Sequence, residues 1–469
     1  MMNRRLFAAL VFPVLLVVSA AGSSAAELRV GGAAVTINPP PGTPLAGYYE
    51  PRGSVDVLDD LFAKAVVLEK DGVKAALVVC DLISVPRPTV EAARGLIEKQ
   101  TGIPGTHVMI SATHEHTGPV LSRGSARDKM DGGSGDLAAR YTAELPAKIA
   151  QCVAEADKRL AAAKVSAGIG REDGISFNRR YWMKDGSVSW NPPKNDPRII
   201  RPAGPIDPDV GVLYFEGLDA RPLVTYVNFA MHPDTTGGTR VSADYPGALA
   251  RRLADYKGEA MLTVFANGAC GNINHLDNRW SAQKSGPAEA KRLGTILAGA
   301  VLKTYPQLKA VAPGPLQARS QVLQIPLPKV TPEDLAEARE VQKRVSDRKT
   351  TFTEKVRAYK VLDVAAREGK PLEAEVQVIA LGDQIAWVSL PGEVFVELGL
   401  SIKKASPFSY TMIAELASGS VGYIPNKSAY PEGNYEVVSA RCAEGSGEMI
   451  VSAAIKMLEE LGPKPTKGH

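Results

Sequence analysis

Short apolar runs alternate with helical patterns along almost the whole chain, and this alternation constrains the fold more than any other feature of the sequence. Residues 75–80, 107–112 and 262–265 are apolar runs of strand length. Residues 89–100 and 137–160 instead carry apolar residues at helical spacing. Strands that alternate with helices are typical of α/β proteins, in which helices cover the faces of a sheet. We therefore predict an α/β fold.

A hairpin signal late in the chain predicts that the sheets are mixed. Residues 376–381 and 385–390 flank Gly382-Asp383, a dipeptide that favours a tight antiparallel turn. The 469 residues are 45% hydrophobic and 23% charged, which provides enough apolar surface for a large core and argues against intrinsic disorder. We expect one large domain, residues 27–462, with mixed β-sheets flanked by helices.

Two segments carry distinct local signals. Thr331, followed by Pro332 and two acidic residues, is typical of a capped helix start, and it opens a charged stretch that predicts exposed helices. Residues 122–136 are rich in Gly and Ser and predict a flexible loop.

The two ends of the chain are expected to lie outside the folded domain. Arg4 and Arg5 precede an apolar run, residues 6–18, and small residues follow it, so residues 1–26 resemble a secretory signal peptide. No later apolar run reaches about 18 residues, so no transmembrane anchor is expected after the signal is removed. The protein is therefore predicted to be secreted or periplasmic, with a disordered tail at residues 463–469.

Charge and cysteine content exclude two classes of protein. The 55 Lys and Arg residues nearly balance 51 Asp and Glu residues, and no basic run stands out, which disfavours nucleic-acid binding. The cysteines lie far apart and form no CxxC pair, so a thiolate zinc knot is excluded. Export permits disulfides, but the sequence does not choose among the three possible pairings. The four cysteines are Cys80, Cys152, Cys270 and Cys442.

Three of the six histidines lie at predicted strand ends. His114 and His116 directly follow the strand at 107–112, and His232 ends another strand. Ligands bind beyond the carboxyl ends of strands in open α/β sheets. His114 and His116 can bind one metal together, or one can be a ligand and the other a proton-transfer group, or both can belong to an ordinary hydrogen-bonded turn. Asp244, which leads into a predicted helix, could support a ligand from behind or cap the helix, and we favour the cap.

Later segments place further polar groups after strands. Residues 266–275 form a small, amide-rich loop that can bring backbone donors to a ligand, although a self-satisfied turn is the simpler reading. Glu393 follows the late hairpin. Tyr423 and Tyr435 stand beyond it, and each of these side chains could equally be an ordinary packed or solvated residue.

Taken in order, these blocks resemble the catalytic region of the neutral, non-lysosomal ceramidases, which are zinc amidases that split the N-acyl bond of ceramide. Residues 32–39, G-A-A-V-T-I-N-P, are similar to the family's G-A-x-x-D-I-T-P, and Gly47-Tyr48 matches its G-Y. Residues 113–119, T-H-E-H-T-G-P, are similar to its T-H-T-H-S-G-P. The resemblance spans most of the chain and implies a ceramidase-like catalytic domain, without the family's C-terminal immunoglobulin-like domain.

The resemblance also implies a site with one zinc ion per chain. Imidazole, carboxylate and phenolate oxygen are acceptable zinc ligands, and an open position holds a water whose acidity the metal raises. The implied zinc ligands are His114, His232, Glu393 and Tyr423. The residues implied to line the substrate site are His116, Arg179 and Tyr435.

One departure from the family concerns the mechanism. The family motif G-D-V-S-P-N carries a serine that is regarded as catalytic, whereas this chain reads Gly271-Asn272-Ile273-Asn274-His275. Asn274 stands where the serine should be, and an amide is neither a nucleophile nor a general base. A mechanism based on a zinc-activated water survives, with His116 as the proton shuttle and Tyr435 or Asn274 as donor to the oxyanion.

These features predict an exported zinc-dependent hydrolase that attacks an amide bond of an N-acyl lipid or another small N-acyl substrate, with transient contact with a membrane surface. The alternative is a catalytically inactive relative that binds a lipid or an envelope component. A serine hydrolase is poorly supported, because the sequence contains no GxSxG nucleophile elbow.

Overall fold

The computed structural model describes residues 27–49 and 51–463. The proposed signal peptide, residues 1–26, lies outside the described residues, as does the predicted tail apart from Pro463. No helix in the described ranges is long and apolar enough to cross a membrane.

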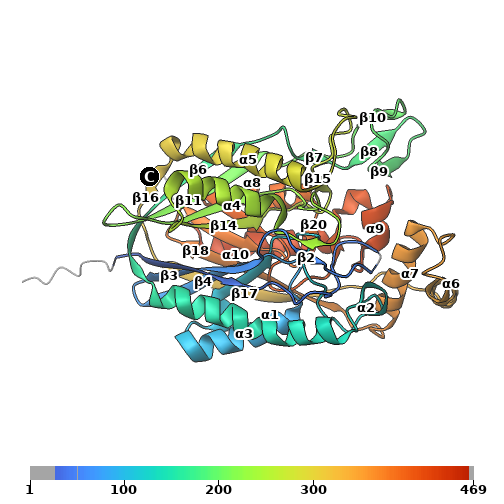
Figure 1. Ribbon diagram of the computed structural model, residues 1–469, viewed down its shortest axis with the longest axis horizontal. Coiled ribbons are helices and arrows are strands. Elements are labelled where there is room, and N and C mark those ends of the chain that lie inside the picture. The colour runs from blue at the N-terminus through green and yellow to red at the C-terminus, as the bar shows by residue number, and fades with distance from the viewer. Residues whose placement is uncertain (1–26, 50, 464–469) are drawn as a thin grey trace, which may run out of the picture.

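The largest element is a mixed nine-stranded sheet that runs in the order β14-β12-β11-β6-β1-β3-β4-β5, with β16 paired to β6 (Figure 1). Most neighbours are antiparallel, but β12 pairs parallel with β14 and β4 parallel with β5. The strands are β1 Arg29–Thr36, β3 Phe62–Lys70, β4 Val73–Cys80, β5 Val108–Ala112, β6 Ala161–Arg171, β11 Asp209–Gly217, β12 Pro222–Phe229, β14 Leu262–Asn267 and β16 Lys309–Val311.

A second, four-stranded sheet runs in the order β17-β18-β19-β21. Its strands are β17 Leu316–Ile325, β18 Leu372–Leu381, β19 Ile385–Ser389 and β21 Tyr410–Ala414. Strands β18 and β19 form the antiparallel hairpin that Gly382-Asp383 predicted, and β19 pairs parallel with β21. The α/β class with mixed sheets is therefore confirmed.

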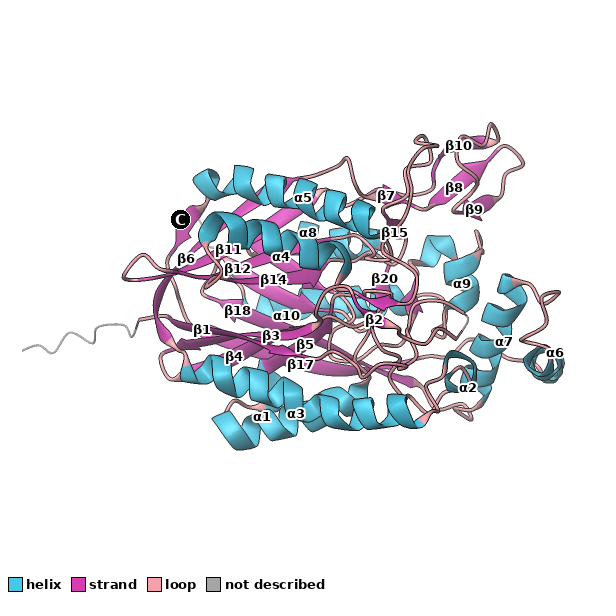
Figure 2. Ribbon diagram, viewed as in Figure 1, coloured by secondary structure: helices cyan, strands magenta, loops and turns pink. Residues whose placement is uncertain are grey.

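The two sheets pack face to face, and helices cover their outer faces, so the molecule has four layers (Figure 2). This arrangement follows from the strands, in which successive side chains point to opposite faces of the sheet, so that each sheet can pack against helices on one face and against the other sheet on the second. In β3, Ala65 and Val67 point to one core and Val66 and Leu68 to the core between the sheets. Trp387 of β19 is fully buried in that inner core.

The helices of the outer layers fall into three groups. One pair covers the β1–β5 half of the large sheet, a second pair covers its other half, and a third pair covers the four-stranded sheet. These pairs are α1 Arg87–Thr101 with α3 Asp136–Lys158, α4 Asp244–Lys257 with α5 Pro287–Thr304, and α8 Val396–Ala405 with α10 Ser446–Leu461.

Small elements gather at one end of the layers (Figures 1 and 2). They include a three-stranded sheet and three two-stranded pairings. These strands are β2 Asp56–Val57, β7 Phe177–Asn178, β8 Arg180–Met183, β9 Val188–Trp190, β10 Ile199–Pro202, β13 Arg240–Val241, β15 Ile273–Asn274, β20 Glu393–Val394 and β22 Tyr423–Ile424. The short helices α2 Asp128–Asp131 and α9 Tyr435–Ser439 lie at this end too (Figure 1). Three 3-10 turns connect other elements: Gly105–His107 precedes β5, Tyr305–Gln307 lies between α5 and β16, and Lys427–Ala429 follows β22.

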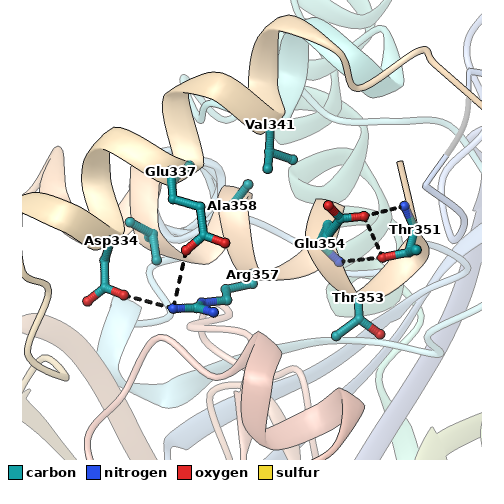
Figure 3. Close-up of a pocket in the computed structure, with 10 residues that line it drawn as sticks. Asp334, Glu337, Val341, Thr351, Thr353, Glu354, Arg357 and Ala358 are labelled. Atoms are coloured by element: carbon teal, nitrogen blue, oxygen red, sulfur yellow. Dashed lines mark hydrogen bonds and ion pairs between the residues drawn. The ribbon is translucent and has the colours of Figure 1, made fainter. Parts of the chain in front are cut away.

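The helical hairpin α6 Pro332–Lys343 and α7 Phe352–Ala365 begins as the sequence predicts. Thr331 accepts a hydrogen bond from the Asp334 backbone, and the Asp334 side chain bonds back to Thr331, which completes a capping box. A pocket of about 220 Å³ lies between the two helices, where Arg357 bridges Asp334 and Glu337 (Figure 3). The hairpin alone lines this pocket, and none of the candidate site residues reaches it.

The flexible loop predicted for residues 122–136 is wrong in part, because it contains helix α2. The Asp128 carboxylate accepts hydrogen bonds from the backbone of Arg123 and Gly124 and from the Ser125 hydroxyl, at 2.7–2.8 Å. A single carboxylate therefore folds the segment back on itself, which the Gly and Ser content alone does not reveal.

A buried ion pair joins helix α1 of an outer layer to strand β18 of the four-stranded sheet. Arg94 of α1 donates to both oxygens of Glu375 of β18, at 2.9 and 2.8 Å, and also to the Val108 carbonyl. The Ser320 hydroxyl donates to the same carboxylate. Burial raises the pKa of Glu375, but Arg94 outweighs it and the net shift is downward.

We predict that Arg94→Met destabilises the protein by about 2–4 kcal/mol, because it removes two charge-assisted hydrogen bonds from the buried Glu375 carboxylate and leaves it only the more distant pair with Arg87, at 3.1 Å, among the described residues. Lys343→Met removes an exposed pair with Glu340 and should cost less than about 1 kcal/mol. Urea unfolding followed by circular dichroism measures both. Equal stability of the two variants would contradict the prediction.

Candidate metal site

Three histidine side chains meet at the carboxyl ends of strands from the large sheet. His114 and His116 follow β5, and His232 lies three residues beyond β12. Their ligand atoms all lie within 4.8 Å of one another, and the ring centroids of His114 and His232 are 4.5 Å apart. His114 adopts a left-handed backbone conformation with φ of 73°, which turns the chain sharply after the strand. This trio could hold a metal ion.

Backbone carbonyls orient two of these imidazoles. The Nδ1 atom of His114 lies 2.8 Å from the Ile83 carbonyl, and the Nδ1 atom of His232 lies 2.8 Å from the Cys270 carbonyl. Because a carbonyl only accepts, each Nδ1 carries the hydrogen and each Nε2 presents a lone pair. Both Nε2 atoms face the same point.

That point is occupied by the carboxylate of Glu393. Its Oε2 atom lies 3.3 Å from His114 Nε2 and 3.4 Å from His232 Nε2. Burial raises the pKa of Glu393, but the two imidazoles outweigh burial and hold it well below its usual value. Burial, with the positive charge of Arg179 nearby, lowers the pKa of His232 to about 4. The site therefore holds a carboxylate against a neutral His232.

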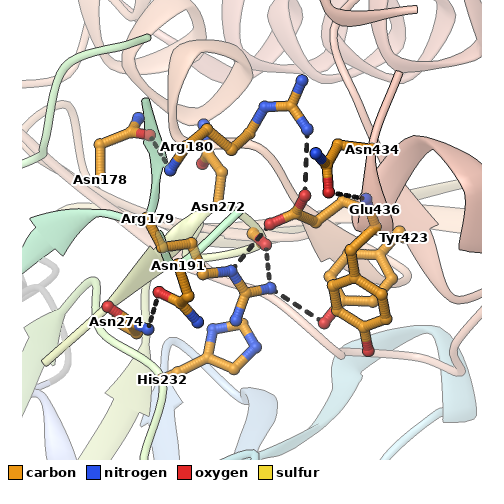
Figure 4. A network of polar contacts seen from close by, with 12 residues as sticks. Asn178, Arg179, Arg180, Asn191, His232, Asn272, Asn274, Tyr423, Asn434 and Glu436 are labelled. Carbon is orange, nitrogen blue, oxygen red and sulfur yellow. Dashed lines mark hydrogen bonds and ion pairs between the residues drawn. The ribbon is translucent and has the colours of Figure 1, made fainter. Parts of the chain in front are cut away.

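Tyr423 comes to the site beside Glu393 because β20 and β22 pair in parallel with these two residues in register. Burial raises the pKa of Tyr423 well above its usual value, as does the neighbouring Glu393 carboxylate. The Arg179 guanidinium donates to the Tyr423 hydroxyl at 3.0 Å and to the Gly271 carbonyl at 2.7 Å (Figure 4).

Glu436 fixes the arginine in place. Its two carboxylate oxygens accept from Arg179 at 2.9 Å and from Arg180 at 3.0 Å, and all three side chains are buried. Tyr435 precedes it, with its ring 5.4 Å from that of Tyr423. A small aromatic cluster covers Tyr435 on the other side, since the rings of Trp190 and Phe352 lie 4.6 and 5.2 Å from it.

His116 lies beside the candidate ligands, whereas the side chain of Asn274 is held in a hydrogen-bonded loop. The Nε2 atom of His116 lies 3.4 Å from that of His114, so this imidazole borders the candidate ligands. Asn274 is fully buried, donates to the Asn191 side chain at 3.0 Å and accepts from the Leu276 backbone at 3.1 Å. Its amide is thus engaged in a turn, which is the simpler of the two readings of the amide-rich loop.

Sequence reasoning missed several polar groups beneath and beside the site. Glu415, just beyond β21, is fully buried, and burial raises its pKa to about 8. His275 bonds Asp234 at 3.0 Å through Nδ1. The strand-end rule that singled out the histidines also applies to Glu415 and could have found it.

Two other expectations are resolved by the structure. The helix-cap role of Asp244 is wrong, because Ala243 is the N-cap residue of α4. The Asp244 carboxylate accepts from the backbone of Thr235 and Thr236, in the loop that follows His232, and from the Tyr245 backbone in the first turn of α4. The cysteines, whose pairing the sequence left open, are all buried and free.

Comparisons with known proteins identify the fold. No family model matches the sequence, and no curated protein matches it. Among solved structures, neutral ceramidase from Pseudomonas aeruginosa matches with a TM-score of 0.72 and 17% identity, over 93% of this chain and 75% of that chain. A ceramidase complexed with C2 matches with a TM-score of 0.72 and 16% identity, over 94% of this chain and 77% of that chain. The fold is therefore ceramidase-like.

Close backbone packing beside the site yields a test of its geometry. A Cβ atom added to Gly271 would collide with the carbonyl oxygen of Glu393. We predict that Gly271→Ala lowers stability by about 1–3 kcal/mol through this overpacking. Gly299 of α5 has open space around it, so Gly299→Ala should be neutral or slightly stabilising. Thermal unfolding compares the stability of the two variants, and a Gly271→Ala variant as stable as the wild type would contradict the close packing of Gly271 against Glu393.

Proposed function

We propose that this protein is an exported zinc-dependent hydrolase that cleaves the amide bond of an N-acyl substrate. The observation that carries the proposal is the Glu393 carboxylate between the Nε2 atoms of His114 and His232, at 3.3 and 3.4 Å, in a ceramidase-like fold. Two imidazole nitrogens and a carboxylate that converge on one point form a donor set that suits a divalent ion.

The donor atoms are compatible with the zinc ion that the resemblance to neutral ceramidases implies. His232 Nε2 is buried and has no hydrogen-bond partner among the described residues, so it is available as a ligand. Tyr423 lies beside Glu393 and completes the proposed set of His114, His232, Glu393 and Tyr423. His116 borders this set as a neighbour of His114. The donor chemistry accommodates zinc, and we propose one ion per chain.

Zinc bound there would act as a Lewis acid, polarising the amide carbonyl and increasing the acidity of a bound water. His116 is a neutral imidazole in this proposal, because burial holds its pKa well below the usual value, so it can accept a proton from the attacking water and then give that proton to the leaving amine. Arg179 holds Tyr423 in place by its 3.0 Å hydrogen bond. Tyr435 donates to the developing oxyanion. Asn274 is less suited to that role, because its amide already bonds Asn191 and Leu276.

The proposed substrate class is an N-acyl lipid or another acylated amine. The support for this class is the fold shared with the two ceramidase structures, together with the aromatic rings of Trp190 and Phe352 that lie against Tyr435. We propose that an exported enzyme of this kind reaches a lipid substrate by transient contact with a membrane surface.

The proposal predicts that the zinc-loaded protein hydrolyses at least one member of a panel of N-acyl amides, and that His114→Ala lowers the rate by at least about 100-fold because a ligand is lost. His107→Ala is the matched control, since His107 bonds only the Lys74 carbonyl, outside the site. Mass spectrometry of the released acid and amine measures the rates of the two variants. Equal rates for the two variants would refute the assignment of His114.

Zinc retention tests the ligand role of the Glu393 carboxylate separately from activity. Glu393→Gln removes the anionic ligand and should weaken zinc binding by about 10- to 100-fold. Glu373→Gln changes an exposed glutamate of β18 and should retain zinc as the wild type does. Zinc content after dialysis against a chelator is the measurement. Wild-type zinc content in Glu393→Gln would remove Glu393 from the ligand set.

A second candidate function is a catalytically inactive, ceramidase-like protein that binds a lipid or an envelope component. The observation that favours it is Asn274, which stands in place of the expected serine and whose side-chain amide bonds the Asn191 side chain and the Leu276 backbone. Stoichiometric zinc in the wild type, without cleavage of any N-acyl substrate in the panel, would support this second function over the first.

A further inference from the structure

We infer that Asn267 and Glu415 form a positioning pair that sets the spacing between the candidate metal ligands. Both side chains are fully buried. Asn267 is the last residue of β14 in the large sheet, and Glu415 directly follows β21 in the four-stranded sheet. The inference rests on the proposed function, because it assigns these residues a part in holding the same site.

Asn267 connects the two histidine segments. Its side-chain nitrogen donates to the Thr113 carbonyl at 3.1 Å, and its side-chain oxygen accepts from the Met231 backbone at 3.2 Å. Thr113 directly precedes His114, and Met231 directly precedes His232. One planar amide therefore fixes the distance between the backbones that carry both imidazoles.

Glu415 connects the carboxylate segment to one histidine. Its Oε2 atom accepts from the backbone of Cys270 at 3.0 Å and of Val394 at 3.1 Å. Val394 directly follows Glu393, and the Cys270 carbonyl accepts from His232 Nδ1. The Cys270 thiol donates to Oε1 at 2.8 Å. One carboxyl group thus holds Glu393 and His232 in a fixed relation.

The two members are themselves joined, because the Glu415 backbone donates to the Asn267 carbonyl at 3.0 Å. The chain beyond Glu415 is sharply turned, with positive φ at Leu416 and Ser418, and Leu416 bonds to Gly392 on one side and Ala112 on the other. Such backbone costs free energy and persists only where the surroundings hold it. The pair and this turn together form a continuous link between the ends of both sheets.

The chemistry of the pair argues for positioning rather than simple packing. A buried amide or carboxyl group costs free energy unless it is hydrogen-bonded, and apolar side chains would fill the same volume without that cost. Each side-chain hydrogen bond that Asn267 and Glu415 make within the described residues ends on a segment that carries a candidate ligand or its orienting carbonyl. Partners of this kind orient ligands and tune metal affinity.

The test uses Co²⁺ as a spectroscopic substitute for zinc in the full-length protein. Glu415→Met and Asn267→Leu remove the hydrogen bonds at similar volume, whereas Glu415→Gln keeps an oxygen for the two backbone donors. Glu375→Gln is the control, since it alters a buried glutamate of β18 outside the site. Affinity comes from chelator competition, and ligand geometry from the visible absorption spectrum of the bound Co²⁺.

We expect Glu415→Met and Asn267→Leu to bind Co²⁺ about 10- to 100-fold more weakly and with an altered spectrum, and Glu415→Gln to stay within about threefold of the wild type. Glu375→Gln should lower stability and leave the spectrum unchanged. Wild-type affinity and spectrum in both Glu415→Met and Asn267→Leu would overturn the inference. If those two fail to fold, Asn267→Ser decides, since its hydroxyl is uncharged but too short to bond both the Thr113 carbonyl and the Met231 backbone, and wild-type binding by it would also overturn the inference.

Hydrogen exchange separates this inference from the proposed function. If the wild type binds neither Co²⁺ nor zinc, the proposed function fails, but the pair is still judged by its backbone contacts. Glu415→Met should then speed amide exchange at Cys270 and Val394, and Asn267→Leu should speed it at Met231. Unchanged exchange at these amides would overturn the positioning role.

Discussion

The structure depends on one contact, the approach of a single, largely buried carboxylate to two imidazoles at the place where the two sheets end. Glu393 belongs to a segment that follows the four-stranded sheet, whereas His114 and His232 extend from the large sheet. Charged and polar groups are expensive to remove from water unless they satisfy one another. The sheets therefore have to stack with their strand ends aligned, and the face-to-face packing of β3 and β19 through the inner core achieves this alignment.

The sequence predicted the local parts of this architecture well, because local parts leave periodic signals. The hairpin at Gly382-Asp383 and the capping box at Thr331 are each determined by neighbouring residues, and both were found. The four-layer arrangement was not predicted, since it depends on which distant strands pair. Asp128 shows the same limit at short range, because its contacts with Arg123 and Gly124 order a segment whose composition suggested a loop.

The sequence likewise predicted some residues of the candidate site and missed others. The order of motifs, through their resemblance to a known family, pointed to His114, His232, Glu393 and Tyr423, and the structure brings these side chains together. Asn267 and Glu415 also stand at strand ends, but they act on backbone atoms, and a sequence pattern does not show which segments those atoms belong to. Asp244 was assigned to its own helix for the same reason, although its carboxylate holds the Thr235 loop.

The positions of the site residues along the chain have a consequence for biosynthesis. His114 emerges from the ribosome early, whereas Tyr423, Tyr435 and Glu436 emerge only shortly before the final helix α10. Contacts between such distant residues form late in folding, because the loop between them must close first. A nascent chain therefore carries its histidines through most of the synthesis of this domain without the partners that complete the constellation, which can assemble only after Glu436 has left the ribosome.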